Sequence, residues 1–322
     1  NIPQSGNQYM KKIFPLLIIL FCTLEGSAEG KLASSLRFGR ISVDKGLSQS
    51  TVFCSYQDSQ GFLWFGTDDG LNKYDGYNFE VYKFDPTDTK TLSNNSVHVI
   101  FKESKKNLFV GTDLGLNLYN PQNGSFRRFQ NIPGDPASIS SNIISSIAED
   151  KDGVVWIGTS KGLNALNTEN FSFSVNHSNK ANVSTLSSDV ISCLLVDKSG
   201  TVWVGTASNG INAFDPKTKK CTRYTSIPGD KNSLSENDIT TITQDRSGNL
   251  WIGTVNGGVN VMNVSSRQFI HYTTENGLSN NSIFSVLEDQ EGIFWIGTLG
   301  GGLDALDRAT GRTMNYKFDP LN

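Results

Sequence analysis

The chain has 322 residues, of which 37% are hydrophobic and 18% are charged, and its formal net charge at pH 7 is -3. A chain of this length and hydrophobic content can bury a sizeable core, so it is a globular protein. The slight acidic excess provides no basic surface to neutralise several phosphates, which argues against nucleic acid as a partner. With 31 Gly, 19 Phe and 5 Trp, the composition favours short strands and tight turns.

The N-terminal region predicts a secretory signal. Residues 10–28 have a basic start, an apolar stretch shorter than the roughly 18 residues of a membrane helix, and small residues at a cleavage site. We therefore expect residues 1–9 to be upstream, non-native sequence, residues 10–28 to be a signal peptide, and the mature chain to be exported. A lipid anchor on Cys22 is the alternative, which Phe21 immediately before it disfavours.

A repeat of 44 to 48 residues runs through the rest of the chain. It is marked by six Gly-Thr pairs, which begin at Gly66, Gly111, Gly158, Gly205, Gly253 and Gly297. Two residues before each Gly lies an aromatic residue: Trp64, Phe109, Trp156, Trp203, Trp251 and Trp295. All five tryptophans of the chain therefore occupy one repeat position, which indicates six copies of one structural unit.

Each unit predicts four short strands. Eight residues before each Gly lies an acid, and in five of the six units another Gly follows that acid by three residues. The acids are Asp58, Glu103, Asp150, Asp197, Asp245 and Asp289. Asp-x-x-Gly between apolar runs is typical of a hairpin turn, in which the acid bonds its own backbone and the Gly takes a positive φ. Four strands in about 45 residues is the size of one propeller blade, so the chain is predicted to be all-β, with a β-propeller of six four-stranded blades over residues 37–322.

The strand count predicts an incomplete ring. An extra outer strand is expected at Gly39–Val43, before the first unit, which makes seven outer strands against six sets of the inner three. A closed ring needs equal numbers, because the N-terminal strand normally completes the last blade. We therefore expect a fragment of a seven-bladed ring, whose missing strands follow residue 322.

Three cysteines remain after the predicted signal peptide. Cys54 and Cys193 occupy the same repeat position three units apart, which is too far for one disulfide in a ring, and Cys221 is left over. We expect three free, buried thiols.

Several short motifs have a structural explanation. Gly158-Thr-Ser-Lys-Gly162 matches the elbow of a serine hydrolase around Ser160, but the same turn recurs between two strands in other units. Asp150-Lys-Asp-Gly153 resembles the start of a calcium loop, but the equivalent turns lack the series of ligands. The three histidines are scattered, so we expect no metal and no cofactor.

Two sets of polar residues form a candidate binding ring. The first set enters the innermost strands: Ser50, Asn95, Asn142, Asp189, Asn237 and Asn281. The second set lies in the turns between second and third strands: Asp68, Asp69, Asp113, Lys161, Asn209 and Asn256. Strand direction alternates, so both sets are expected at one end of the propeller, where their amides and carboxylates suit sugar hydroxyls. The alternative is that they only cap turns and strand starts.

The repeat resembles the two-component regulator propeller repeat. The residues that carry the resemblance are Gly-Leu-Ser at 46–48 and 277–279, Glu-Asp at 288–289, Trp-Ile-Gly-Thr at 295–298 and Gly-Gly-Leu at 301–303. The second unit departs from the pattern, with Phe109 in place of Trp and no Gly in the turn at 105–107.

This resemblance implies the periplasmic sensor region of a hybrid two-component histidine kinase of the Bacteroidetes type. Members of that family combine two seven-bladed propellers and a β-sandwich with a membrane helix, a kinase, a receiver and a DNA-binding domain. The implied partners are an oligosaccharide ligand, the second propeller and sandwich of the parent chain, and a second copy in a homodimer. The implied role is control of polysaccharide use, with no catalytic residue in this segment. A scaffold or dimerisation propeller and, less favoured, a secreted lyase or glycosidase remain as alternatives.

Overall fold

The computed structural model describes residues 32, 36 and 38–317, and the predicted signal peptide lies outside them. Within these residues the chain forms 24 β-strands and two short 3-10 helices, η1 (Val43–Lys45) and η2 (Thr274–Asn276). None of the helices in the described residues is long and apolar enough to cross a membrane. The predicted all-β class is confirmed.

The strands form six four-stranded antiparallel sheets, each built from four consecutive strands. Blades 1 and 2 contain β1 (Val52–Gln57), β2 (Leu63–Thr67), β3 (Gly70–Tyr74), β4 (Phe79–Tyr82), β5 (Val97–Lys102), β6 (Leu108–Thr112), β7 (Gly115–Asn120) and β8 (Ser125–Phe129). Blades 3 and 4 contain β9 (Ile144–Glu149), β10 (Val155–Thr159), β11 (Gly162–Asn167), β12 (Ser172–Asn176), β13 (Ile191–Val196), β14 (Val202–Thr206), β15 (Ile211–Asp215) and β16 (Lys220–Tyr224). Blades 5 and 6 contain β17 (Ile239–Gln244), β18 (Leu250–Thr254), β19 (Val259–Met262), β20 (Phe269–Tyr272), β21 (Ile283–Glu288), β22 (Ile293–Thr298), β23 (Gly302–Asp307) and β24 (Arg312–Tyr316).

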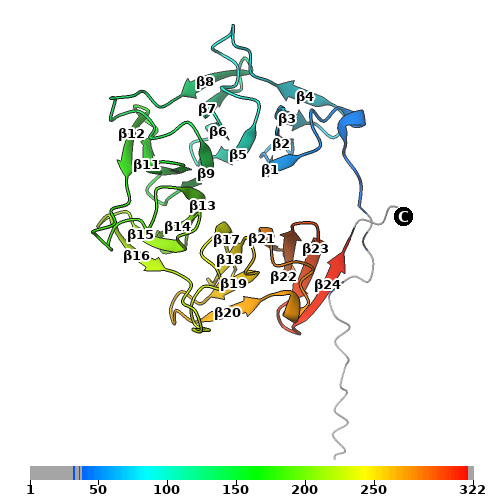
Figure 1. Cartoon of the computed structure of the whole chain (residues 1–322). Helices are drawn as coiled ribbons and strands as arrows, with labels where there is room; N and C mark the ends of the chain where they lie inside the picture. The colour runs from blue at the N-terminus through cyan, green and yellow to red at the C-terminus, as the bar shows by residue number, and fades with distance from the viewer. Residues whose placement is uncertain (1–31, 33–35, 37, 318–322) are drawn as a thin grey trace, which may run out of the picture.

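The six sheets stand around a common axis as a β-propeller (Figure 1). The first strand of each blade is innermost, and the innermost strands of consecutive blades lie side by side from β1 to β21. Buried clusters fill the spaces between neighbouring blades. Since a single blade cannot bury both of its faces, these inter-blade clusters are the core of the molecule.

The ring is open between blade 6 and blade 1. In Figure 1, β21 and β1 border a gap, and they do not pack together as the other innermost strands do. Leu287 on β21 is 64% exposed, whereas Ala148 at the same repeat position in blade 3 is 9% exposed. Trp295 is half-buried, whereas Trp156 is buried. The open faces are consistent with another blade between them, and the seventh blade itself stays a prediction.

The expected extra outer strand is wrong for the described residues. Residues 39–42 are not part of a strand, and the last residue of the expected segment, Val43, begins the helix η1. A strand needs a neighbour to pair with its backbone N–H and C=O groups. Each of the six described sheets already has its own fourth strand.

The hairpin between the first and second strands has the predicted form, with one contact that sequence reasoning did not anticipate. In blade 4, one carboxylate oxygen of Asp197 accepts bonds from the backbone N–H groups of Ser199 and Thr201, at 2.8 and 3.0 Å. Its other oxygen accepts the indole N–H of Trp203 at 2.7 Å. The same Asp–Trp bond recurs in blades 1, 3, 5 and 6 at 2.8 to 3.1 Å. The acid therefore fixes both the turn and the aromatic residue that packs against the next blade.

Close packing explains the small residues of the innermost strands. Cys193 on β13 pairs with Gly205 on β14, and a Cβ on that Gly would lie 2.4 Å from the Cys193 Sγ. The same Cβ would lie 2.9 Å from Ile239 of the next blade. Because the Gly of the Gly-Thr pair has no side chain, a side chain of the innermost strand and one of the next blade can both pack against its backbone.

The three cysteines in the described residues are free thiols, as predicted. Cys193 is buried, whereas Cys54 and Cys221 are half-buried, so the expectation of full burial is correct only for Cys193. Burial raises the pKa of Cys54 and of Cys193 to about 12, and that of Cys221 to about 11. These thiols are therefore poor nucleophiles at neutral pH.

Candidate functional site

A repeated polar network holds the loops at one end of the ring, where the turn between the second and third strands of each blade lies. In blade 2, the backbone N–H of Ser93 donates to Asn117 Oδ1 at 2.8 Å, and Ser93 Oγ lies 2.8 Å from Thr112 Oγ1. Asn117 and Thr112 are completely buried. Every blade has the equivalent bond from a Ser N–H to an Asn or Asp side chain on its third strand. The loop that enters each innermost strand is therefore fixed to its own blade.

The first predicted set of ring residues joins neighbouring blades. In five of its six members, all but Ser50, the side-chain oxygen accepts the backbone N–H of a residue just after the outer strand of the preceding blade, at 2.5 to 2.8 Å. The five residues are Asn95, Asn142, Asp189, Asn237 and Asn281. For four of them, excluding Asn142, the backbone carbonyl also accepts a bond from the N–H of the Gly that ends the turn between the second and third strands of the preceding blade, at 2.7 to 2.9 Å. These residues therefore have a defined structural role.

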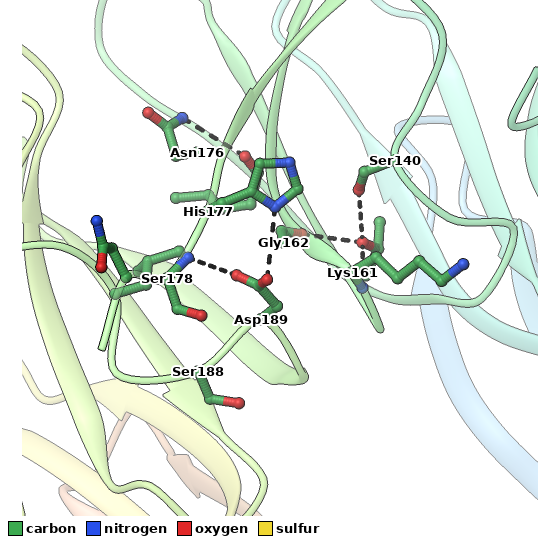
Figure 2. Close-up of polar contacts among 12 residues, drawn as sticks. Ser140, Lys161, Gly162, Asn176, His177, Ser178, Ser188 and Asp189 are labelled. Atoms are coloured by element: carbon green, nitrogen blue, oxygen red, sulfur yellow. Dashed lines mark hydrogen bonds and ion pairs between the residues drawn. The ribbon is translucent and has the colours of Figure 1, made fainter. Parts of the chain in front are cut away.

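Figure 2 shows this arrangement between blades 3 and 4. The Ser178 N–H donates to Asp189 Oδ1 at 2.5 Å, and His177 Nδ1 lies 3.5 Å from Asp189 Oδ2. Asp189 is still 35% exposed, so it can also meet a ligand from solvent. The side chain of Lys161, on the preceding turn, is exposed and extends away from the carboxylate.

The second predicted set lies at the same end of the ring, as expected. Asp69 forms an ion pair with Lys83 at 2.6 Å and accepts a bond from Asn95 Nδ2 at 3.2 Å, which brings members of both sets together. Asn256 is bound by Glu236 through its backbone N–H and, at 3.5 Å, through its side chain. Asn209, like Lys161, is exposed. The remaining two, Asp68 and Asp113, belong to a cluster that sequence reasoning did not find.

This His98 cluster consists of Phe53, Asp68, Ser96, His98 and Asp113, from blades 1 and 2. His98 Nε2 lies 2.9 Å from Asp113 Oδ1 and 3.3 Å from Ser96 Oγ, and Ser96 Oγ donates to Asp68 Oδ1 at 3.0 Å. The rings of Phe53 and His98 are 4.9 Å apart between centroids. The side chains of His98 and Asp113 are 30% and 48% exposed, so the cluster is open to solvent.

The hydrogen-bond pattern determines what the cluster can do. Ser96 gives its single hydroxyl proton to Asp68, so its oxygen can only accept from His98 Nε2–H. Both neighbours of His98 lie at Nε2, whereas a hydrolytic triad needs the nucleophile and the acid on opposite ring nitrogens. The cluster therefore lacks the geometry of a Ser-His-Asp catalyst. It offers two carboxylates, an imidazole and an aromatic face, which suit the binding of a ligand with hydroxyl groups.

Phe53 and His98 are the extra residues of β-bulges. In each blade the pairing of the first two strands skips one residue near the start of the innermost strand. The skipped residues are Phe53, His98, Ser145, Ser192, Thr240 and Phe284. A bulge re-aims the side chain of the extra residue. No sequence motif marks the bulge. The one signal in the sequence is that the residue type at this repeat position varies from blade to blade.

The two short motifs with alternative readings are structural in this fold. Ser160 lies in the β10–β11 turn and bonds Ser141 Oγ at 2.8 Å. Asp150 accepts the N–H groups of its own hairpin and the indole of Trp156, at 2.8 to 3.0 Å. No group of three His, Cys, Asp or Glu residues that could hold a metal ion occurs among the described residues.

The architecture defines the chain as a β-propeller domain with a polar rim. The two-component regulator propeller family matches it at residues 46–69, 138–161, 185–208, 233–256 and 277–300. In every blade except blade 2, these segments run from the loop that enters the innermost strand to the turn between the second and third strands. Five segments of the chain, one in each of five blades, therefore match this repeat family.

The chain is also similar to solved structures and to a curated relative. The extracellular domain of a hybrid two-component system from B. thetaiotaomicron is 27% identical, with a TM-score of 0.75, over 87% of this chain and 37% of that one. Histidine kinase P4 from Formosa agariphila is 41% identical over 80 residues, which are 25% of this chain and 6% of the kinase. Virginiamycin B lyase from Staphylococcus aureus, 11% identical with a TM-score of 0.61 over 84% of this chain and 85% of the lyase, shares the fold alone. This chain thus corresponds to a small part of the first two relatives, and it resembles an extracellular sensor domain.

Proposed function

We propose that this chain is the periplasmic ligand-sensing propeller of a hybrid two-component receptor, and that its ligand is an oligosaccharide released from a polysaccharide. The repeat family and the similarity to the extracellular domain of a hybrid two-component system support the receptor assignment. In this proposal, binding at the propeller is transmitted to a kinase elsewhere in the receptor and controls genes for polysaccharide use. The chain itself performs no catalysis.

The His98 cluster is the observation that carries the sensing role. A saccharide presents hydroxyl groups that need both donors and acceptors, and apolar ring faces that pack against aromatic side chains. Asp68 and Asp113 supply hydrogen-bond acceptors, and His98 supplies its other ring nitrogen, Nδ1. Phe53, which is 45% exposed, supplies an apolar face. A hydroxyl bonded to an ionised carboxylate forms a charge-assisted bond, which is stronger than a neutral one.

A scaffold role is the second candidate, and the first ring set favours it. The side-chain oxygens of Asn95, Asn142, Asp189, Asn237 and Asn281 already accept backbone N–H groups that link blades. In this alternative, the rim positions neighbouring domains of the receptor and the ligand binds elsewhere.

Calorimetric titration of the purified chain with oligosaccharides from partial hydrolysis of plant, algal and host polysaccharides tests the sensing role. One fraction should bind, and its affinity should fall at least about tenfold in Phe53→Ala and in Asp113→Asn, which each remove one contact. Phe284→Ala is the matched control, because Phe284 is the bulge residue of blade 6 and is 61% exposed. Binding that both cluster variants leave unchanged, or a panel without any binder, would favour the scaffold.

A further inference from the structure

A cavity lies between blades 1 and 2, at the opposite end of the ring from the His98 cluster. Its volume is about 440 Å³, and its walls include the hairpin Asp58–Gln60, the aromatic residues Trp64 and Tyr119, and three lysines. The lysines are Lys73, Lys102 and Lys106. Sites for small molecules typically measure roughly 300 to 1,000 Å³, so this cavity has room for a monosaccharide or disaccharide.

The three lysines are specific to this pair of blades. At the position of Lys73 the later blades have Leu118, Ala165, Ala213, Val261 and Ala305. At the position of Lys102 the other blades have Gln57, Glu149, Val196, Gln244 and Glu288. At the position of Lys106 they have Gly61, Gly153, Gly200, Gly248 and Gly292. The repeat itself therefore does not require a cation at any of these positions, and blades 1 and 2 bring three together.

The wall of the cavity carries an excess of positive charge, although Lys102 interacts electrostatically with Asp58. Within the part of the chain that the structure describes, none of the three lysines forms an ion pair with a carboxylate. Lys73 Nζ lies over the Phe62 ring, 4.3 Å from its centroid. The single acid in the cavity wall is Asp58, which is already bonded to its own hairpin and to the Trp64 indole. Three ammonium groups against one carboxylate leave an excess of two positive charges.

Lys106 also has an unusual backbone conformation. Its φ is 75°, in the region that the Gly residues of the other five hairpins occupy. A residue with a side chain costs about 1 kcal/mol there relative to Gly. Strained residues of this kind cluster at functional sites, where the side chain is needed despite its cost. The strain places an ammonium group at the cavity where every other blade has no side chain.

Part of the cavity wall is aromatic and is held in place by ring contacts. The Tyr119 and Trp64 rings meet edge to face with their centroids 5.3 Å apart, and the Tyr119 hydroxyl lies 3.0 Å from that of Tyr82. Trp64 is buried and Tyr119 is half-buried, so Tyr119 presents the more accessible ring. A wall that combines aromatic rings with three cations suits a ligand with an apolar face and a negatively charged substituent.

We propose that this lysine cavity binds a small oxyanion-bearing ligand, a carboxylate or a sulfate, whose body packs against Tyr119. The three ammonium groups would surround the oxyanion with charge-assisted hydrogen bonds. The site is separate from the His98 cluster and does not depend on the function proposed for that cluster.

Calorimetric titration of the purified chain with sodium sulfate, sodium glucuronate and glucose, at ionic strength held constant with chloride, tests the proposal. Sulfate and glucuronate should bind and glucose should not. The affinity for both anions should fall about tenfold or more in Lys73→Ala and in Lys106→Gly. Lys106→Gly is the decisive variant, because it relieves backbone strain and so cannot weaken binding by unfolding the protein. Glucuronate binding much tighter than sulfate would indicate a saccharide-borne anion, and equal affinities a free oxyanion.

Lys151→Ala is the matched control. Lys151 lies in the equivalent hairpin of blade 3 and lines a different cavity, together with Asp150, Asp152 and Asp215. Its removal changes the net charge by the same amount and should leave the affinity unchanged within about twofold. An equal loss in Lys151→Ala, or no anion binding by the native chain, would overturn the proposal. Phe53→Ala should not affect sulfate binding, so the outcome is distinguishable from that of the rim experiment.

Discussion

Blades 2 and 4 form the same hairpin between their first two strands with different side chains. In both, the acid and the residue four positions later bond through the backbone, Glu103 N–H to Asn107 O and Asp197 N–H to Thr201 O, each at 3.0 Å. In blade 4 the acid also holds the Trp203 indole, whereas blade 2 has Phe109, which has no donor. One oxygen of Glu103 is consequently buried without a hydrogen-bond partner among the described residues.

The difference shows that backbone pairing is sufficient to form the hairpin, and that the Asp–Trp bond adds stability to it. Phe109 is completely buried against Ile144 and Ile147 of the next blade, so the packing role of the aromatic residue is kept in blade 2. What blade 2 lacks is the polar contact. Variants that exchange features between the two blades therefore separate packing from hydrogen bonding.

The largest effect is expected when blade 4 is made to resemble blade 2. Trp203→Phe removes the indole N–H and leaves a carboxylate oxygen of the buried Asp197 without its 2.7 Å partner. An unpaired buried charged group and the lost ring volume should together destabilise the chain by about 2–4 kcal/mol. Urea unfolding monitored by far-UV circular dichroism measures this change.

Trp295→Phe is the matched variant for this experiment. Trp295 makes the same bond to Asp289, at 2.8 Å, but it is half-buried at the open face of blade 6. Water can replace the lost donor there, so the cost should be about 1 kcal/mol. Equal losses for the two variants would mean that burial does not determine the value of the bond.

The second effect is a pH dependence that distinguishes the two acids. Burial raises the pKa of Glu103 above its ordinary value, and the nearby Glu149 carboxylate adds to this effect. Burial also acts to raise the pKa of Asp197, but hydrogen bonds from Ser199 and Trp203 outweigh it, and the pKa lies below its ordinary value. Glu103→Gln should therefore stabilise the chain by about 1 kcal/mol at neutral pH.

The sign of each effect follows from proton binding. Glu103 binds its proton more tightly in the folded chain than in the unfolded chain. Its ionised carboxylate therefore lowers the free energy of unfolding above the folded pKa, and this loss disappears as the pH falls through that value. The gain in Glu103→Gln should disappear over the same range. Asp197 contributes stability above its unfolded pKa, near 3.9, which is lost as the pH falls through the lower folded pKa. Urea unfolding between neutral and acidic pH measures both, and a gain in Glu103→Gln that grows on acidification would contradict the assignment.

These contacts also show which parts of the structure could be predicted from sequence. The six blades, the hairpin turns and the position of both ring sets follow from the repeat, because turn residues and strand alternation act locally. The bond from Asp197 to Trp203 could have been proposed from their constant spacing. The bulge at His98 could not, because it depends on how β5 pairs with β6. The prediction of the extra outer strand was wrong because a strand needs a neighbouring strand to pair with. The repeat pattern does not reveal whether such a neighbour is present.

A smaller effect is expected at the turn position that follows the acid by three residues. Lys106 in blade 2 and Gly200 in blade 4 both have positive φ, 75° and 92°. Lys106→Gly should stabilise the chain by about 0.5–1 kcal/mol, because the relief of strain exceeds the entropy that Gly adds to the unfolded state. Gly200→Lys should cost a similar or larger amount. Thermal unfolding of the two variants checks the prediction, and opposite signs to these would show that the turn is not strained.

The smallest effect is expected on the innermost strands, where Cys193 of blade 4 and Val99 of blade 2 occupy the same position over a Gly. Cys193→Val replaces a thiol by a slightly larger apolar group in a place that already accepts Val in blade 2, so unfolding should change by less than about 1 kcal/mol. With a pKa raised to about 12 by burial, the Cys193 thiol should react with a disulfide reagent at pH 8 only after the protein unfolds. Stability and labelling therefore report on one site in two independent ways. A loss of several kcal/mol in Cys193→Val would mean that the blades differ in spacing as well as in polar contacts. Cys193 would then lie closer to Ile239 of blade 5 than Val99 lies to Ile144 of blade 3.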